Sequence, residues 1–228
     1  MKKKTIPVSK PKPAAPLPPQ EPAKSIRPAD VLAAGPDIIL AMTYLTVWIN
    51  PGALAPGTGE HLATLMLVEF IVIHSSVLLG NALLNSNTSR DRWAGFGMLF
   101  SFYMLFIMAI SAAFWSLWPA VYFIGLTANR FLALLLGQAP SGDEKAMMMG
   151  LWGCSALYYL LGVFITCLLP IPELGLAEFS IDLPGEGLWV DDPHRPIACG
   201  FIYFSLNGWT ALKASSYNWR QTMASSMS

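Results

Sequence analysis

The feature that most constrains this chain is a series of long apolar segments that fills most of its length. The longest apolar stretch runs from Trp93 to Leu136. It contains about 44 residues, whereas one helical crossing of a bilayer needs about 20. The stretch therefore requires two crossings. The break is predicted at Trp115-Ser-Leu-Trp-Pro119, because the residue before a proline disfavours helix and tryptophans prefer the headgroup level.

Segments of this kind predict an all-α, polytopic integral membrane helix bundle with about six transmembrane helices. The composition agrees, because 54% of the residues are hydrophobic and only 12% are charged, about half the charged fraction of soluble domains. The predicted helices cover residues 36–53, 62–84, 94–115, 118–137, 147–169 and 196–213. The first is expected to begin near Pro36, after an interfacial turn from Pro28 to Ala34, and the last is marginal in length.

Residues 1–30 are rich in lysine and proline and predict a disordered cytoplasmic tail. No signal peptide is expected, because prolines stand where an apolar core would follow the lysines. With six crossings and residues 215–228 also cytoplasmic, Arg195 is the only basic residue outside. Arg130 lies well within a segment, whereas Lys213, at the end of the last one, counts as cytoplasmic. This distribution follows the positive-inside rule, and a bacterial inner (cytoplasmic) membrane is the predicted location. A five-helix alternative would place the C-terminal tail outside.

Five polar residues within the predicted membrane segments are candidates for a functional or structural role: Glu69, His74, Ser76, Asn81 and Arg130. At 100° per residue, Glu69 and Ser76 share one helix face, whereas His74 and Asn81 lie on another. Glu69 and His74 are about 140° apart, so each is expected to meet a different neighbour. An ionised group at the bilayer centre costs at least about 2.5–3.5 kcal/mol, so such side chains normally face the bundle interior.

Two interpretations of these residues remain open from the sequence. In the first, Arg130 extends to the cytoplasmic headgroups, Glu69 is protonated or hydrogen-bonded, and His74 bonds a neighbouring helix. In the second, all three line a polar cavity for a proton, an anion or a small solute. A contact with another subunit is a third alternative. Asp37, directly after Pro36, is predicted to cap the start of the first helix near the interface.

The predicted outer loop, residues 170–195, mixes acidic with apolar side chains and is expected to lie on the bilayer surface or to cap the bundle. The outer-face candidates are Asp191, Asp192, His194 and, from the start of the second segment, His61. One short acidic run with one histidine gives little support for a metal site, and the calcium-loop order D-x-D-x-D-G is missing. No metal site is predicted.

Haem is not expected either, because His74 is the only histidine predicted to be buried in the membrane, and no other cofactor is implied. Cys167 and Cys199 would lie near the same membrane face, which leaves a disulfide between them open. Free cysteines more often pack as small apolar side chains.

The sequence contains no catalytic signature, since G-x-S-x-G, P-loop, H-E-x-x-H and G-x-G-x-x-G patterns are missing. No catalytic residue is predicted, and an enzyme is not favoured. The sequence favours a non-catalytic accessory or scaffold subunit of a membrane complex, with the lipid bilayer and other membrane-protein subunits as partners and no nucleic acid. The alternative is a small-solute or proton-coupled transporter or channel that uses Glu69, His74 and Arg130. Without evident internal repeats, the common repeat-built transporter folds are less expected.

Overall fold

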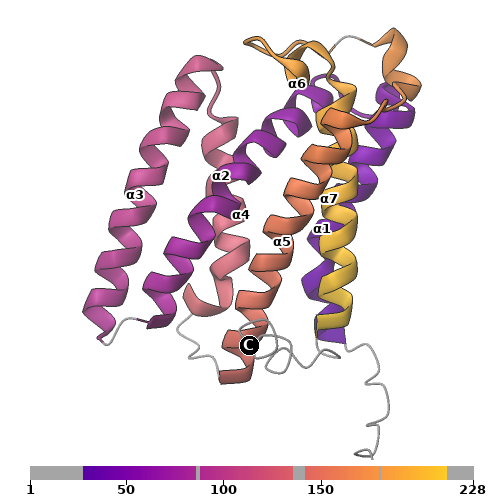
Figure 1. The fold of residues 1–228 in the computed structure, drawn as a ribbon. Helices are drawn as coiled ribbons and strands as arrows, with labels where there is room; N and C mark the ends of the chain where they lie inside the picture. Colours follow the sequence, from indigo (N-terminus) through magenta and orange to yellow (C-terminus); the bar gives the residue numbers. More distant parts are fainter. Residues whose placement is uncertain (1–27, 86–87, 136–141, 180, 215–228) are drawn as a thin grey trace, which may run out of the picture.

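The computed structural model describes residues 28–85, 88–135, 142–179 and 181–214. These residues form helices and connecting segments, and no β-strand occurs among them (Figure 1). The all-α prediction is therefore confirmed for this part of the chain. The predicted C-terminal tail and residues 1–27 of the predicted N-terminal tail lie outside the described residues.

The described residues contain long helices joined by short helical turns. The long helices are α1 (Pro28–Ile49), α2 (Thr58–Asn85), α3 (Ser89–Ala113), α4 (Trp118–Leu135), α5 (Gly142–Leu168) and α7 (His194–Lys213). The short elements are η1 (Pro51–Ala53), η2 (Leu174–Glu178) and α6 (Leu188–Asp191). Among the described residues, four helices are long and apolar enough to cross a membrane, namely α1, α2, α3 and α5.

The prediction for the start of the first helix is wrong. Helix α1 begins at Pro28 and runs through Pro36, so Pro28 to Ala34 is not an interfacial turn. Asp37 consequently lies inside the helix and does not cap its start. Pro28 suits the first helical position, where no amide donor is needed. An internal proline is tolerated in membrane helices because neighbouring groups satisfy the freed backbone.

The break predicted within the long apolar stretch is confirmed, since α3 ends at Ala113 and α4 begins at Trp118. The Thr88 side chain caps the start of α3 by accepting a hydrogen bond from the amide of Asp91 at 3.1 Å. Such a cap satisfies one of the amides that a helix start leaves without an intrahelical partner. The three cysteines are free, so no disulfide joins Cys167 and Cys199.

Helix α2 lies centrally and packs against α3, α4, α5 and α7, while α1 packs mainly along α7 (Figure 1). Glycine allows the close approach of α1 and α7. A Cβ atom added at Gly200 would lie 2.3 Å from the Tyr44 ring, and one at Gly208 would lie 2.9 Å from Ile38. Small residues serve this purpose widely in membrane helix interfaces.

One end of the bundle carries η2 and α6, and the first and last described helices begin and finish at the opposite end (Figure 1). The segment after α5 covers the end of α1. Trp48 donates a hydrogen bond from Nε1 to the carbonyl oxygen of Pro172 at 2.9 Å. A Cβ atom on Gly175 would lie only 2.1 Å from the carbonyl oxygen of Ile49, so the two backbones are in direct contact.

Candidate functional site

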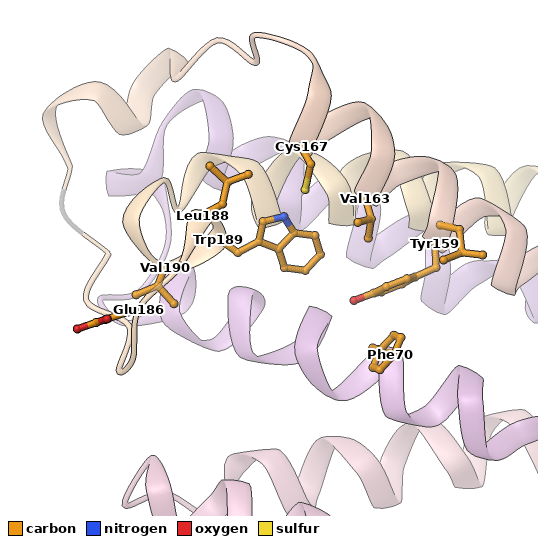
Figure 2. A pocket seen from close by; sticks show the side chains of 10 residues that line it. Phe70, Tyr159, Val163, Cys167, Glu186, Leu188, Trp189 and Val190 are labelled. Atoms are coloured by element: carbon orange, nitrogen blue, oxygen red, sulfur yellow. The ribbon is translucent and has the colours of Figure 1, made fainter.

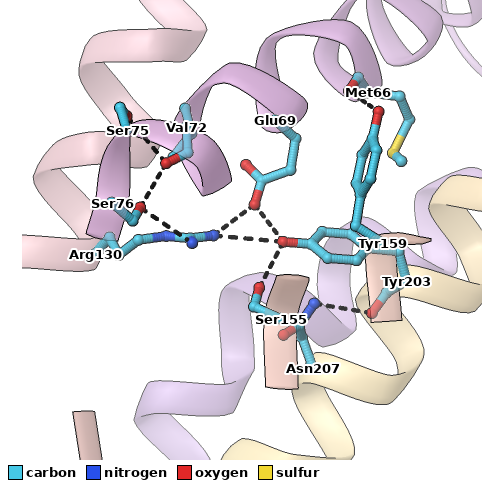
Figure 3. Close-up of polar contacts among 10 residues, drawn as sticks. All are labelled: Met66, Glu69, Val72, Ser75, Ser76, Arg130, Ser155, Tyr159, Tyr203 and Asn207. Atoms are coloured by element: carbon cyan, nitrogen blue, oxygen red, sulfur yellow. Dashed lines mark hydrogen bonds and ion pairs between the residues drawn. The ribbon is translucent and has the colours of Figure 1, made fainter. Parts of the chain in front are cut away.

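An ion pair between α2 and α4 forms the centre of the candidate site (Figure 3). Arg130 donates from Nη2 to Oε1 of Glu69 at 2.6 Å. The Glu69 side chain is 1% exposed and the Arg130 side chain 14%. Because both charges are removed from solvent, each depends on the other for its electrostatic stabilisation.

Tyr203 of α7 binds the same carboxylate oxygen, because its hydroxyl donates to Glu69 Oε1. The Ser155 hydroxyl of α5 lies 2.8 Å from the Tyr203 oxygen. A tyrosine hydroxyl has one hydrogen, and here Glu69 receives it. Ser155 is therefore the donor to Tyr203, which links α5 to the ion pair.

Ser76 of α2 holds the other arm of the guanidinium. Arg130 Nη1 donates to Ser76 Oγ at 3.3 Å, and that hydroxyl donates to the carbonyl oxygen of Val72 at 2.5 Å. We refer to Glu69, Ser76, Arg130, Ser155 and Tyr203 as the Glu69 cluster. It joins α2, α4, α5 and α7 at one place (Figure 3).

Two features leave the Glu69 cluster chemically incomplete as a closed ion pair. Oε2 of Glu69 is buried and has no hydrogen-bond partner in the part of the chain that the structure describes. Asp37 of α1 is close enough to interact electrostatically with both Glu69 and Arg130. With two carboxyl groups and one guanidinium, one carboxyl group can carry a proton while the other pairs with Arg130. Oε2 of Glu69 can also accept a hydrogen bond.

The position of Glu69 follows from the small residues on its helix face. Ser76 lies seven residues after Glu69, which places both on one side of α2. Gly80 continues that side, and a Cβ atom added there would lie 2.2 Å from the Trp152 ring of α5. The small residues let the neighbouring helices approach α2, so the carboxylate is covered rather than exposed to lipid.

The structure separates His74 and Asn81 from the Glu69 cluster. Both lie on the exposed face of α2, and the His74 ring stacks on Phe70 of the same helix with 6.3 Å between ring centroids. Glu69 and His74 therefore meet different neighbours, as their spacing predicted. The interpretation in which Arg130 extends to the headgroups is wrong, because the guanidinium is bound to Glu69 of α2. Glu69, His74 and Arg130 do not converge on one cavity.

The outer-face candidates divide into two places: Asp191, Asp192 and His194 line one pocket together with Glu173, whereas His61 lies apart from them. His61 of α2 packs edge-on against the Trp118 ring, with 5.0 Å between centroids. His194 is the first residue of α7 and is buried, and Asp191 ends α6. Asp192 forms an ion pair with Arg195. No group of three or more His, Cys, Asp or Glu side chains suited to a metal ion occurs among residues 28–85, 88–135, 142–179 and 181–214.

Arg195 connects the beginning of α7 to the end of α5. Its Nε donates to Asp192 Oδ2 at 2.8 Å. Its Nη1 donates to the carbonyl oxygens of Thr166 and, at 3.4 Å, Leu169. These carbonyls belong to the last turn of α5 or follow it, where the helix leaves acceptors without intrahelical donors. Arg195 therefore has a structural role at this corner.

Two members of the Glu69 cluster, Tyr203 and Ser155, were not among the predicted site residues. Tyr203 lies near the middle of α7. Tyrosine in membrane proteins prefers the interfaces, and a buried hydroxyl needs a partner. A tyrosine in the middle of a predicted membrane segment is therefore a usable sequence signal, whereas a single serine such as Ser155 gives none.

Several long apolar helices place the fold in the class of helical membrane proteins, and the buried ion pair is compatible with this class. Comparison with known proteins finds no matching family model, no matching curated protein and no matching solved structure.

Proposed function

We propose that the chain crosses a bacterial inner membrane six times, with both termini in the cytoplasm. We further propose that it serves as a non-catalytic accessory or scaffold subunit of a membrane complex. In this proposal α4 and α7 cross together with the four longer apolar helices. At 1.5 Å per residue their 18 and 20 residues measure about 27 Å and 30 Å, close to the hydrocarbon thickness of about 30 Å.

The basic residues at the helix ends support this orientation. Arg90 near the start of α3, Lys145 near the start of α5 and Lys213 at the end of α7 belong to one end of the bundle (Figure 1). Arg195 belongs to the other end, next to α6. Basic residues accumulate on the cytoplasmic side of membrane proteins, so the Arg90 end is assigned to the cytoplasm.

The observation that carries the proposed role is the pairing of Glu69 with Arg130 at 2.6 Å inside the chain. The two charges neutralise each other, Tyr203 binds Glu69 Oε1, Ser76 binds the guanidinium, and Ser155 binds the Tyr203 hydroxyl. Such an arrangement supports a structural role, because it joins four helices around one buried ion pair. The ionisable groups then act on helix packing rather than on transport.

A proton-coupled or small-solute transporter or channel is the second candidate. It is supported by Oε2 of Glu69, which lacks a hydrogen-bond partner within the described residues, and by the nearby Asp37. Glu69 and Arg130 would carry that activity. His74, on the exposed face of α2, would have no part in it.

Two measurements on the full chain test the choice. The purified protein is reconstituted into liposomes with a trapped pH dye, and native mass spectrometry of a mild-detergent extract records which polypeptides accompany it. We expect no proton flux above protein-free liposomes, co-migration with other chains at fixed stoichiometry, and a lower cellular amount of Glu69→Gln. A flux that Glu69→Gln abolishes at an unchanged protein level would establish the transporter instead. Ser76→Ala, which keeps the ion pair, is the matched control.

A further inference from the structure

One face of α2 carries polar side chains where lipid would be expected. Leu67, Phe70, His74, Val77 and Asn81 are all exposed along this face, with Phe70 at 49% and Val77 at 63%. We call these five residues the α2 seam. The rest of α2 is largely buried against α3, α4, α5 and α7.

His74 lies at a depth where an exposed imidazole is unfavourable in lipid. The apolar span of α2 runs from Thr58 to Leu84, and His74 is three residues, about 4.5 Å, from its midpoint. Hydrocarbon offers no hydrogen-bond partner, so polar side chains at this depth normally face protein. Stacking on Phe70 covers one side of the ring but supplies no such partner. Lipid alone therefore leaves the His74 imidazole at this depth without a hydrogen-bond partner.

The spacing of the seam is compatible with a pair of helices packed along it. From Leu67 to Asn81 its residues follow one another at intervals of three, four, three and four. This is the heptad spacing of a left-handed helix pair, in which Phe70 and Val77 occupy one core position and Leu67, His74 and Asn81 the other. In a parallel pair with two-fold symmetry, each core residue lies opposite its own copy.

The polar residues of the seam are self-complementary. A neutral imidazole has one donor and one acceptor, and an amide side chain has both kinds of group. Two copies of either residue can therefore hydrogen-bond to each other, which two carboxylates or two ammonium groups cannot do. Asn81 also interacts within its own chain, and its four hydrogen-bonding positions leave capacity for a second contact. A single asparagine at such a position fixes the register of helix pairs.

An apolar pocket lies beside the seam. A pocket of about 470 Å³ opens next to Phe70, and Figure 2 shows Tyr159, Val163 and Trp189 around it. Its lining is almost entirely apolar, apart from Glu186 at residues 186–190. Phe70 is the α2 residue in this lining, and the other lining residues belong to α5 and to residues 186–190.

We propose that the α2 seam is the interface of a parallel homodimer whose two-fold axis is normal to the membrane. His74 then lies opposite the partner's His74, and Asn81 opposite the partner's Asn81. This goes beyond the role proposed above and does not depend on it, because a dimer can form in either an accessory subunit or a transporter.

The test uses the full chain without its native cysteines (Cys154→Ala, Cys167→Ser, Cys199→Ala), reconstituted in liposomes at low protein density. Val77→Cys is added at the seam, and Leu105→Cys, at a position 70% exposed on α3, is the matched control. Under mild oxidation we expect a disulfide-linked dimer with Val77→Cys and monomer with Leu105→Cys. Far-UV circular dichroism verifies that both variants are folded.

A second measurement addresses the polar residues. Energy transfer between labelled copies is followed as the protein-to-lipid ratio is lowered. We expect His74→Leu to weaken the dimer by about 3- to 20-fold, which corresponds to one interhelical hydrogen bond in a membrane. Monomer at every ratio, equal cross-linking at both positions, or an unchanged or tighter dimer with His74→Leu would each overturn the proposal. If a different protein covers the seam in the cell, the reconstituted chain remains monomeric. The outcome of the proton-flux assay has no bearing on these three results.

Discussion

The Glu69–Arg130 pair predicts a large loss of stability when one partner alone is neutralised. Glu69→Gln keeps the shape of the side chain but removes its charge. At the observed 2.6 Å and an effective dielectric constant of about 20, the Coulomb attraction is about 6 kcal/mol. The glutamine oxygen still accepts a hydrogen bond, so part of the contact survives. Breaking a buried pair costs about 3–5 kcal/mol, and we expect a value near the lower end.

The double variant separates pairing from the individual side chains. Glu69→Gln combined with Arg130→Met removes both charges, so no unpaired ion remains in the bundle. We expect it to be at least about 2 kcal/mol more stable than the sum of the two single losses implies. Ser155→Ala, which removes one hydroxyl from the same cluster and no charge, is the matched control and should cost about 1 kcal/mol.

The free energy of unfolding is measured by titrating sodium dodecyl sulfate into mixed micelles and following the far-UV circular dichroism. The wild type, both single variants, the double variant and Ser155→Ala are compared at one pH and salt concentration. If Glu69→Gln changes the free energy by less than about 1 kcal/mol, or the single losses simply add, the charges are not coupled and the structural role assigned to the pair is refuted.

Three further outcomes are expected. Gly200→Ala should destabilise the protein by about 1–3 kcal/mol, because the new Cβ would lie 2.3 Å from the Tyr44 ring, whereas Gly153→Ala, which meets nothing within 4 Å, should be neutral or stabilising in the same titration. A membrane-impermeant maleimide applied to spheroplasts should label the exposed Cys167; labelling only after lysis would reverse the topology. Arg195→Gln should lower the thermal midpoint of unfolding, since it removes the bonds to the end of α5; an unchanged midpoint would show that this corner contributes nothing.

The buried pair also explains how a chain with so few charges keeps an arginine in α4. Arg130 lies within a helix of 18 residues; in the proposed six-helix topology, an unpaired guanidinium there would oppose membrane insertion. Glu69 and Ser76 come from α2, which is already the central helix of the bundle. Placement of α4 beside α2 therefore pairs the guanidinium and buries one face of α4, which includes Phe123 and Phe131. The charge thus helps to select this neighbour for α4.

Helix class and most helix limits could be predicted from the sequence, because apolar length and helix-breaking residues act locally. The break after the third helix was predicted at Trp115 to Pro119, and α3 and α4 indeed meet there. The first helix was predicted wrongly for a physical reason. Pro36 is expected to interrupt a helix, as proline does in soluble proteins. In a membrane helix bundle, packed neighbouring groups compensate for the missing hydrogen bond, so the helix continues through the proline.

The pairing of polar residues was decided only by the tertiary structure. Helical periodicity placed Glu69 and His74 on different faces of α2, but periodicity does not reveal which face turns inward. Arg130 is 61 residues from Glu69 and Tyr203 is 134 residues away, so no local pattern connects them. Their meeting depends on how α4 and α7 pack around α2. The same packing leaves His74 exposed, because α3, α4, α5 and α7 cover the other sides of α2 but not the side that carries His74.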